Sequence, residues 1–184
     1  MENFPVSNVF RLIEPGPVLL ATTLYNGRPN IMTIASHLMI HHRSPTLIGC
    51  IVGRWNYSVT AFRETGECVL AVPGADLVDA AVGIGNSSGD KTDKFREYHL
   101  TALPATRVQA PLIGECMANI ECKVVDTSLV DKYRLFILEA VEAHMNPERK
   151  EQRTFHHCGD GTFIVDGHVV DLQKRMTKWW AFLD

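Results

Sequence analysis

Apolar and polar residues alternate along this chain in short runs, a pattern that predicts strands more often than helices. Two of the runs meet at Asn26-Gly27, inside the segment VLLATTLYNGRPNIMTIAS of residues 18–36. Asn-Gly between extended runs predicts a β-hairpin, because both central residues of a type I′ turn need a positive φ. The second run carries more hydrogen-bonding side chains than a purely apolar strand would: Asn30, Thr33 and Ser36.

Four further apolar runs predict strands, at residues 46–53, 68–72, 118–125 and 134–143. A second tight hairpin is expected at Asp166-Gly167, between residues 163–165 and 168–170. Six or more antiparallel strands with short helices inserted between them predict a mainly β fold, a Greek-key barrel. The order of the strands does not follow from the sequence.

Three short helices are expected between the strands, at residues 58–64, 76–84 and 92–98. Asn56 or Ser58 can cap the first of them, and Gly66 stands just past its end. Residues 101–116 contain two prolines and are interpreted as a loop that crosses the fold.

The 184 residues fit a single domain, residues 1–184, which can bury a core without disulfides or metals. The net charge is −3 and no basic block is present, which argues against a nucleic-acid partner. No apolar stretch reaches the ~20 residues that a membrane helix needs, so no membrane association is expected. No signal peptide is readable and the five cysteines form no CxxC pair, so we expect reduced thiols and a cytoplasmic protein.

Several catalytic and cofactor patterns are absent or incomplete. GIGNSSG at residues 83–89 is one residue too long for a dinucleotide fingerprint, and it follows a helical stretch rather than a strand. We interpret it as a flexible polar loop whose serines could reach a phosphate. The eight histidines show no metal-ligand spacing, so no metal site is expected, and no GxSxG nucleophile motif is present.

Residues 53–58 (GRWNYS) place a charged residue, an amide and a hydroxyl where a buried strand ends and a helix begins. Free backbone N–H groups there favour an anion, to which Arg54 can add a bidentate contact and Ser58 a hydroxyl. Simple capping by Asn56 explains the segment equally well on its own. GDKTDKF supplies Lys91 and Lys94 at a second helix start, which is also compatible with an anion.

An ordered series of segments resembles the flavin reductase-like, FMN-binding split-barrel family, in particular its flavoredoxin branch. The series runs from about residue 14 to residue 144 and comprises EPGPVLLATTLYNGRPNIMTIAS, SPTLIGCIVGRWNYSVTAFRETGECVLAVP, GDKTDKF, APLIGECMANIECKVVD and LFILEAVEAH. The closing GTFIVDGHVVDLQKRM is similar to the C-terminal strand pair of that branch. The order and spacing of the segments carry the resemblance more than any one of them.

The resemblance implies a six-stranded antiparallel Greek-key split barrel with short helices, assembled as a homodimer, with FMN at the barrel rim near the subunit boundary. It also implies reduction of flavin by NADH or NADPH without a Rossmann domain. The flavin itself carries the hydride chemistry, so no catalytic side chain is assigned. The sequence leaves open whether an electron-acceptor protein is a partner.

The candidate FMN-binding residues are Asn30, Thr33, Ile34, Ala35, Ser36, Gly53, Arg54, Asn56, Tyr57, Ser58, Ser88 and Lys94. By resemblance, Asn30 and the strand at 33–36 lie along the isoalloxazine ring, which needs a few donors and acceptors in an apolar seat. The segment 53–58 is expected at the ribityl chain and phosphate, and Lys94 near the phosphate or ring edge. Two positions depart from the family: Ser36 stands where relatives often carry Trp, and Tyr133 where many carry His.

The first functional hypothesis is an FMN-dependent oxidoreductase of the flavin reductase type, which transfers reducing equivalents from NAD(P)H to flavin and on to an unidentified acceptor. The alternative is a non-enzymatic, FMN-binding electron carrier of the flavoredoxin kind. A third hypothesis is a flavin-free barrel that binds haem or another planar ligand through its histidines.

Overall fold

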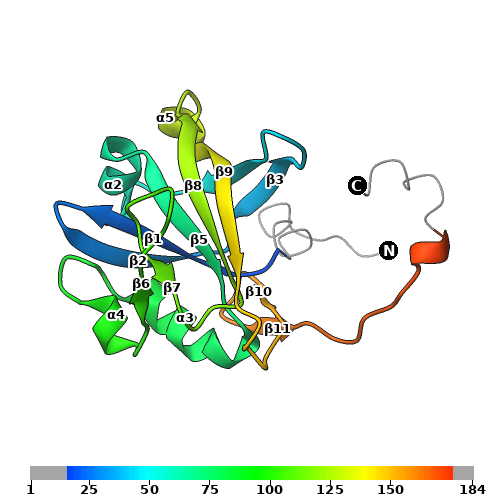
Figure 1. Ribbon diagram of the computed structural model, residues 1–184. Helices are drawn as coiled ribbons and strands as arrows, with labels where there is room; N and C mark the ends of the chain where they lie inside the picture. Colours follow the sequence, from blue (N-terminus) through cyan, green and yellow to red (C-terminus); the bar gives the residue numbers. More distant parts are fainter. Residues whose placement is uncertain (1–15, 176–184) are drawn as a thin grey trace, which may run out of the picture.

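One antiparallel sheet makes up most of the protein, whose structure is a computed structural model that describes residues 16–175 (Figure 1). Its seven strands are β1 (Leu19–Tyr25), β2 (Arg28–Ile34), β3 (His37–His41), β4 (Leu47–Ile51), β5 (Glu67–Val72), β8 (Ala118–Asp126) and β9 (Leu135–Met145). They lie in the order β2-β1-β5-β8-β9-β4-β3, and every neighbouring pair is antiparallel.

The sheet closes into a barrel because its two outer strands are consecutive in the chain. β2 and β3 stand at opposite ends of the strand order, yet only Ala35 and Ser36 separate them. A flat sheet would hold its outer strands roughly 29 Å apart at ~4.8 Å per strand, whereas this link spans at most about 11 Å. The mainly β, split-barrel fold is therefore confirmed. The sheet has seven strands rather than six, because residues 37–41, which follow the expected hairpin, form the further strand β3.

The hairpin expected at Asn26-Gly27 forms, with φ of 51° at Asn26 and 72° at Gly27. Its turn fixes the register in which Thr23 of β1 stands opposite Asn30 of β2. Because side chains alternate along a strand, this register sends Asn30 to one face of β2 and Thr33 to the other.

The second expected hairpin is wrong. β11 (Phe163–Val165) pairs with β10 (Phe155–His157), and residues 168–170 form no strand. β11 pairs with β10 because β10 carries Phe155, whose ring is fully buried in the core. The two valines of the 168–170 segment are 94% and 70% exposed, so a strand there would have no apolar surface to cover.

Short helices connect the strands: α2 (Val59–Glu64), α3 (Val78–Asn86) preceded by the 3-10 turn η2 (Ala75–Leu77), α4 (Lys94–Glu97) and α5 (Val130–Tyr133). The three helices expected from the sequence are confirmed, and α5 is additional. The loop at 101–116 contains the paired two-residue strands β6 (Ala102–Leu103) and β7 (Leu112–Ile113), and η3 (Gln173–Arg175) follows β11. Within residues 16–175 we find no helix with the length and apolar character needed to cross a bilayer.

Two apolar clusters hold the barrel and its helices together. One fills the barrel interior and includes Phe62 from α2 and Phe136 from β9, whose ring centroids lie 5.4 Å apart. The other lies outside the barrel, where Ile84 of α3 and Phe95 of α4 share a cluster with Leu20 of β1. Strand β1 is thus buried on both faces, which explains why its sequence is largely apolar.

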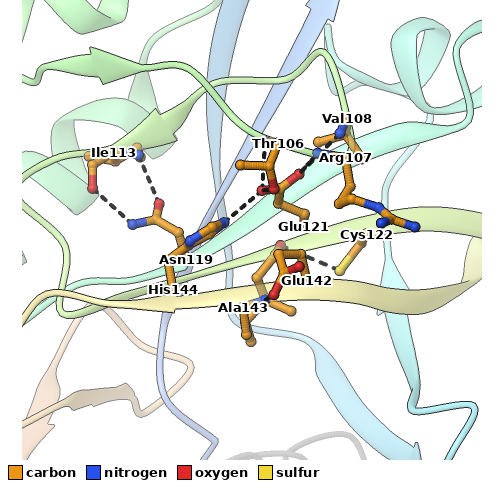
Figure 2. Close-up of polar contacts among 11 residues, drawn as sticks. Thr106, Arg107, Val108, Ile113, Asn119, Glu121, Cys122, Glu142, Ala143 and His144 are labelled. Carbon is orange, nitrogen blue, oxygen red and sulfur yellow. Dashed lines mark hydrogen bonds and ion pairs between the residues drawn. The ribbon is translucent and has the colours of Figure 1, made fainter.

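A buried carboxylate fixes the loop that covers β8 (Figure 2). Glu121 is fully buried and accepts hydrogen bonds from the N–H groups of Thr106, Arg107 and Val108, the Thr106 hydroxyl and His144 Nε2. Burial alone would raise the pKa of this carboxyl group, but these hydrogen bonds, with that of the Thr106 N–H foremost, lower it to about 2. The charged side chain thereby satisfies N–H groups for which the loop has no strand partner.

We expect Glu121→Gln to lower the free energy of unfolding by about 3 kcal/mol at pH 7, because its amide turns a donor toward N–H groups. The folded pKa of Glu121 is depressed, so its contribution is complete above the unfolded pKa of ~4.3. That contribution is lost as pH falls toward the folded pKa of about 2, and the difference between variant and wild type should shrink accordingly. Urea unfolding between pH 7 and about pH 2.5 measures both effects.

Glu67→Gln is the matched control for this prediction. Glu67 accepts one hydrogen bond from the same loop, donated by the Gln109 N–H, so its replacement should cost less than about 1 kcal/mol. Equal losses in the two variants, or a loss at Glu121 that does not change with pH, would contradict the role of the buried carboxylate.

Candidate functional site

A cavity of about 140 Å³ lies where β2, the segment before α2, the end of α3 and the start of α4 meet. Half of the candidate FMN-binding residues line it: Thr33, Asn56, Tyr57, Ser58, Ser88 and Lys94. These residues come from segments that are far apart in the sequence and that only the fold brings together.

Lys94, the first residue of α4, brings a positive charge to this cavity although it is only 5% exposed. Its Nζ donates hydrogen bonds to the carbonyl oxygens of Ile31, at 2.9 Å, and Ile84, at 2.8 Å. An ammonium has three donors, so one remains for a ligand. Burial lowers the pKa of Lys94 to about 8, and no carboxylate of residues 16–175 offsets that shift. A buried ammonium without a counter-ion is unfavourable, so the site favours an anionic ligand.

Asn30 and Ser58 form a second polar pair at this end of the barrel. Asn30 Nδ2 donates a 2.8 Å hydrogen bond to Ser58 Oγ, and the two residues are 5% and 2% exposed. The Ser58 hydroxyl therefore keeps its own proton, which it can donate into the cavity. Asn30 lines an adjoining cavity of about 130 Å³, which shares Tyr57 and Ser58 with the first.

Residues 83–89, expected to be a loop, close the cavity on the side of α3, but 83–86 form the last turn of that helix and only 87–89 are a loop. Ser88 is at the lining, and its hydrogen bond to Asp90 lowers the pKa of that carboxyl group. Gly89 lies against β2 so closely that a Cβ would clash with Asn30 Oδ1, which explains the need for glycine. The loop is thus a fixed wall of the cavity rather than a free surface segment.

Six further residues of the lining were not among the candidate FMN-binding residues: Met32, Trp55, Ile84, Gly85, Ser87 and Gly89. Met32 and Ile84 follow apolar patterns, which are typical of core positions and carry no ligand signal. Gly85, Ser87 and Gly89 belong to segment 83–89, whose sequence predicts a flexible loop. Its Gly- and Ser-rich composition was the sequence feature that could have indicated a phosphate site.

Five candidate residues line neither this cavity nor the adjoining one: Ile34, Ala35, Ser36, Gly53 and Arg54. Ile34 belongs to the barrel core, and the Ser36 carbonyl accepts a hydrogen bond from the Ile51 N–H. Arg54 is exposed, and its Nη2 donates a 2.8 Å hydrogen bond to the Asp131 carbonyl oxygen. Flavin contacts of these residues stay predictions.

Exposed apolar side chains lie next to the cavity and along one edge of the sheet. Trp55 is 75% exposed, with the Arg134 guanidinium 4.5 Å from its ring centroid. Gly53 lies under this indole, where a Cβ would clash with the ring. Strand β3, which within residues 16–175 pairs with β4 alone, exposes Leu38, Met39 and Ile40. An apolar edge strand of this kind is typical of a surface that another protein surface covers.

Neither thiols nor histidines contribute to the cavity lining. Four of the five cysteines are buried, and burial, together with the neighbouring Cys122, raises the pKa of Cys50 to about 12. Residues 16–175 contain no cluster of three His, Cys, Asp or Glu that could hold a metal ion. The hypothesis of a planar group bound through histidines therefore finds no support at this cavity.

The arrangement suits a phosphate at the end of a larger ligand. Lys94 has a free ammonium N–H and Ser58 a free hydroxyl proton that a negatively charged group could accept, and apolar rings border these two donors. Pockets for ligands of cofactor size measure ~300–1,000 Å³, so a cavity of about 140 Å³ accommodates one end of such a ligand. The rest would lie outside, against Trp55 and Tyr57.

Comparisons with solved structures agree with this architecture. The flavoredoxin of Desulfovibrio vulgaris (Miyazaki F) has a TM-score of 0.83 at 23% identity, over 96% of this chain and 100% of that one. The flavoredoxin of Methanosarcina acetivorans has a TM-score of 0.79 at 22% identity, over 97% and 98% of the two chains. At these identities the similarity shows a shared fold.

Sequence comparisons identify the family. An uncharacterized protein of Archaeoglobus fulgidus is 36% identical over 112 residues, which cover 61% of this chain and 63% of that relative, less than two thirds of its length. The family described as the flavin reductase like domain matches residues 11–168. Because this match covers most of the chain, the protein belongs to the family of flavin reductase like domains.

Proposed function

We propose that this protein is an FMN-dependent oxidoreductase of the flavin reductase type, which passes electrons from NADH or NADPH to flavin and on to an unidentified acceptor. The observation that carries the proposal is the buried ammonium of Lys94, at a cavity shared with Ser58. Among residues 16–175 this ammonium has carbonyl partners but no carboxylate partner. The phosphate of FMN would supply the missing negative charge. Membership of the flavin reductase like family supports a flavin as the ligand.

The donors at the cavity fit the phosphate end of FMN. Two backbone carbonyl oxygens hold the Lys94 ammonium in place and leave one N–H free, and Ser58 can donate its hydroxyl proton. Each charge-assisted hydrogen bond stabilises a complex by roughly 1.5–3 kcal/mol. The half-exposed ring of Tyr57 and the exposed ring of Trp55 offer apolar surface to the rest of the ligand. FMN would supply the hydride-accepting ring, while these residues bind and orient it.

The candidate residues of β2 and of the link after it would contact the isoalloxazine ring and the ribityl chain. Asn30 is held by Ser58, and the Thr33 hydroxyl donates a 2.6 Å hydrogen bond to the Ala81 carbonyl oxygen, so β2 offers a rigid edge. We place the isoalloxazine ring along this edge and the link at 34–36. Arg54 would have to leave the Asp131 carbonyl oxygen to reach the phosphate.

A non-enzymatic FMN-binding electron carrier is the second candidate. Lys94 is the only cation that lines the cavity in the described part of the chain. FMN phosphate would therefore leave no charged group there for the diphosphate of a nicotinamide dinucleotide. In a carrier, a partner protein would deliver the electrons instead.

Anaerobic titration of the FMN-loaded protein with NADH and with NADPH tests the proposed activity. We expect one or both to bleach the flavin absorbance rapidly and stoichiometrically, because the ring lies at an open rim that a nicotinamide can approach. Chemical reduction with dithionite is the control for an accessible flavin. If dithionite bleaches the flavin but neither NADH nor NADPH does, the protein is an electron carrier rather than a reductase. Failure to bind FMN at all would overturn both hypotheses.

Lys94→Met should weaken FMN binding about ten- to a hundred-fold, because it removes the ammonium and keeps an apolar chain of similar length. Riboflavin lacks the phosphate, so its affinity should change less than about two-fold. Fluorescence-quench titrations of both ligands measure the difference. Lys91→Met is the matched control, since Lys91 is exposed and lies outside the cavity lining.

The pH dependence gives a second readout of the same contact. The pKa of Lys94 is about 8 without ligand, and a bound phosphate would raise it. The protonated lysine binds better, so FMN affinity should fall as pH rises above about 8, while riboflavin affinity stays level. Equal losses for FMN and riboflavin in Lys94→Met, or the same fall with pH for both ligands, would contradict the phosphate assignment.

We also propose a homodimer in which a second copy covers the β3 edge. Met39 is 57% exposed at the middle of that strand, so Met39→Glu should place a charge in the interface and shift the protein toward monomers. Sedimentation velocity at micromolar concentration measures the shift. Ile164→Glu, at a 61% exposed position of β11, is the control and should leave the dimer intact. A wild-type monomer that retains FMN would rule out the shared interface.

A further inference from the structure

A second hollow, of about 320 Å³, lies where the end of β9 and the residues after it face the β6–β7 pair. It shares no lining residue with the cavity beside Lys94. Its walls are largely apolar and include Leu103, Leu112, Ile113, Met145 and Pro147. Its polar side chains are Asn119, His144, Asn146 and Glu148.

His144 is held in one orientation by the buried carboxylate of Glu121 (Figure 2). Its Nε2 lies 2.7 Å from Glu121 Oε1, and four hydrogen bonds from residues 106–108 fix that carboxylate in turn. A carboxylate can only accept, so in the neutral ring the proton stands on Nε2 and Nδ1 is an acceptor. Nδ1 has no hydrogen-bond partner in the described part of the chain.

Each amide side chain of the hollow is anchored by two hydrogen bonds, one through its oxygen and one through its nitrogen. Asn119 accepts from the Ile113 N–H and donates to the Ile113 carbonyl oxygen. Asn146 donates to the Gly114 carbonyl oxygen and accepts from the Glu148 N–H. The lining contains no Lys or Arg, and the exposed Glu148 adds a further acceptor. The hollow therefore offers the acceptors of His144 and Glu148 in apolar surroundings, beside two amides that are already anchored to the backbone. Its lining has no cation in the described part of the chain.

We propose that this hollow is a binding site for a small uncharged phenol, whose hydroxyl donates a hydrogen bond to His144 Nδ1. The apolar walls would cover the aromatic ring, and the fixed imidazole would select a ligand that carries a donor. Glu121 and Glu148 are negative and no cation of the lining offsets them, so anions are disfavoured. Flavin phosphates and nicotinamide dinucleotides thus belong to the other cavity, and this inference does not depend on the proposed function.

Binding of p-cresol, compared with 4-methylanisole, tests the role of the donor on the FMN-loaded, full-length protein. The two probes differ in that a methyl group replaces the hydroxyl proton. In NMR titrations we expect p-cresol to bind about ten-fold more tightly and to shift the nitrogen-15 resonance of His144 Nδ1. The flavin absorbance spectrum should not change. Equal affinities, no shift at Nδ1, or a change in the flavin spectrum would overturn the site.

His144→Phe tests the acceptor directly. The variant removes Nδ1, and Glu121 keeps its four hydrogen bonds from residues 106–108, so we expect the fold to persist and the preference for p-cresol to vanish. His42→Phe, at an exposed position outside the hollow, is the control and should keep the ten-fold preference. An unchanged preference in His144→Phe would overturn the proposal. If that variant fails to fold, the two probes on the wild type decide alone.

Discussion

The two-residue link between β2 and β3 is the constraint on which the rest of the fold depends. Because it joins the two outer strands of the sheet, the barrel has to close, and one face of every strand becomes interior. Closure also fixes where β2 stands relative to the helices. Its Asn30 side meets the residue that precedes α2, and its Thr33 side meets α3, so the cavity forms at their junction. A longer link would permit an open sheet without that junction.

Two buried charges of opposite sign are satisfied in different ways. Glu121 receives five hydrogen bonds from its own chain, which supply all that a carboxylate needs. Lys94 donates to two carbonyl oxygens and has no negatively charged partner in the described part of the chain. The first charge is therefore a completed structural element, whereas the second has no counter-ion among residues 16–175 and is where the proposed FMN phosphate would bind. His144 donates a hydrogen bond to Glu121 and also borders the hollow between β9 and the β6–β7 pair. The structural carboxylate therefore also orients a side chain of that hollow.

Elements with local determinants could be predicted from the sequence, and elements that depend on distant burial could not. The turn at Asn26-Gly27 forms because its two residues favour positive φ wherever they stand. Residues 163–165 pair with β10 rather than with 168–170, because β10 buries Phe155 in a core whose other residues lie far away in the sequence. Within the site, Lys94 and Ser58 carried a signal as polar residues at helix starts. The hydrogen bond between Arg54 and Asp131 carried none, since 77 residues separate the pair.

If FMN is the ligand of Lys94, as proposed, the uncompensated charge ties the amount of this protein to the supply of flavin. A ligand that binds only the native state stabilises it by about 2.7 kcal/mol at a hundred times its Kd. Without the ligand, the chain carries a lysine that is either charged and desolvated or neutral, and the folded state is correspondingly less populated. Because proteases remove unfolded chains, a cell short of flavin would hold less of the protein at an unchanged rate of synthesis. Through this lysine, a shortage of flavin would thus lead to faster degradation of the protein.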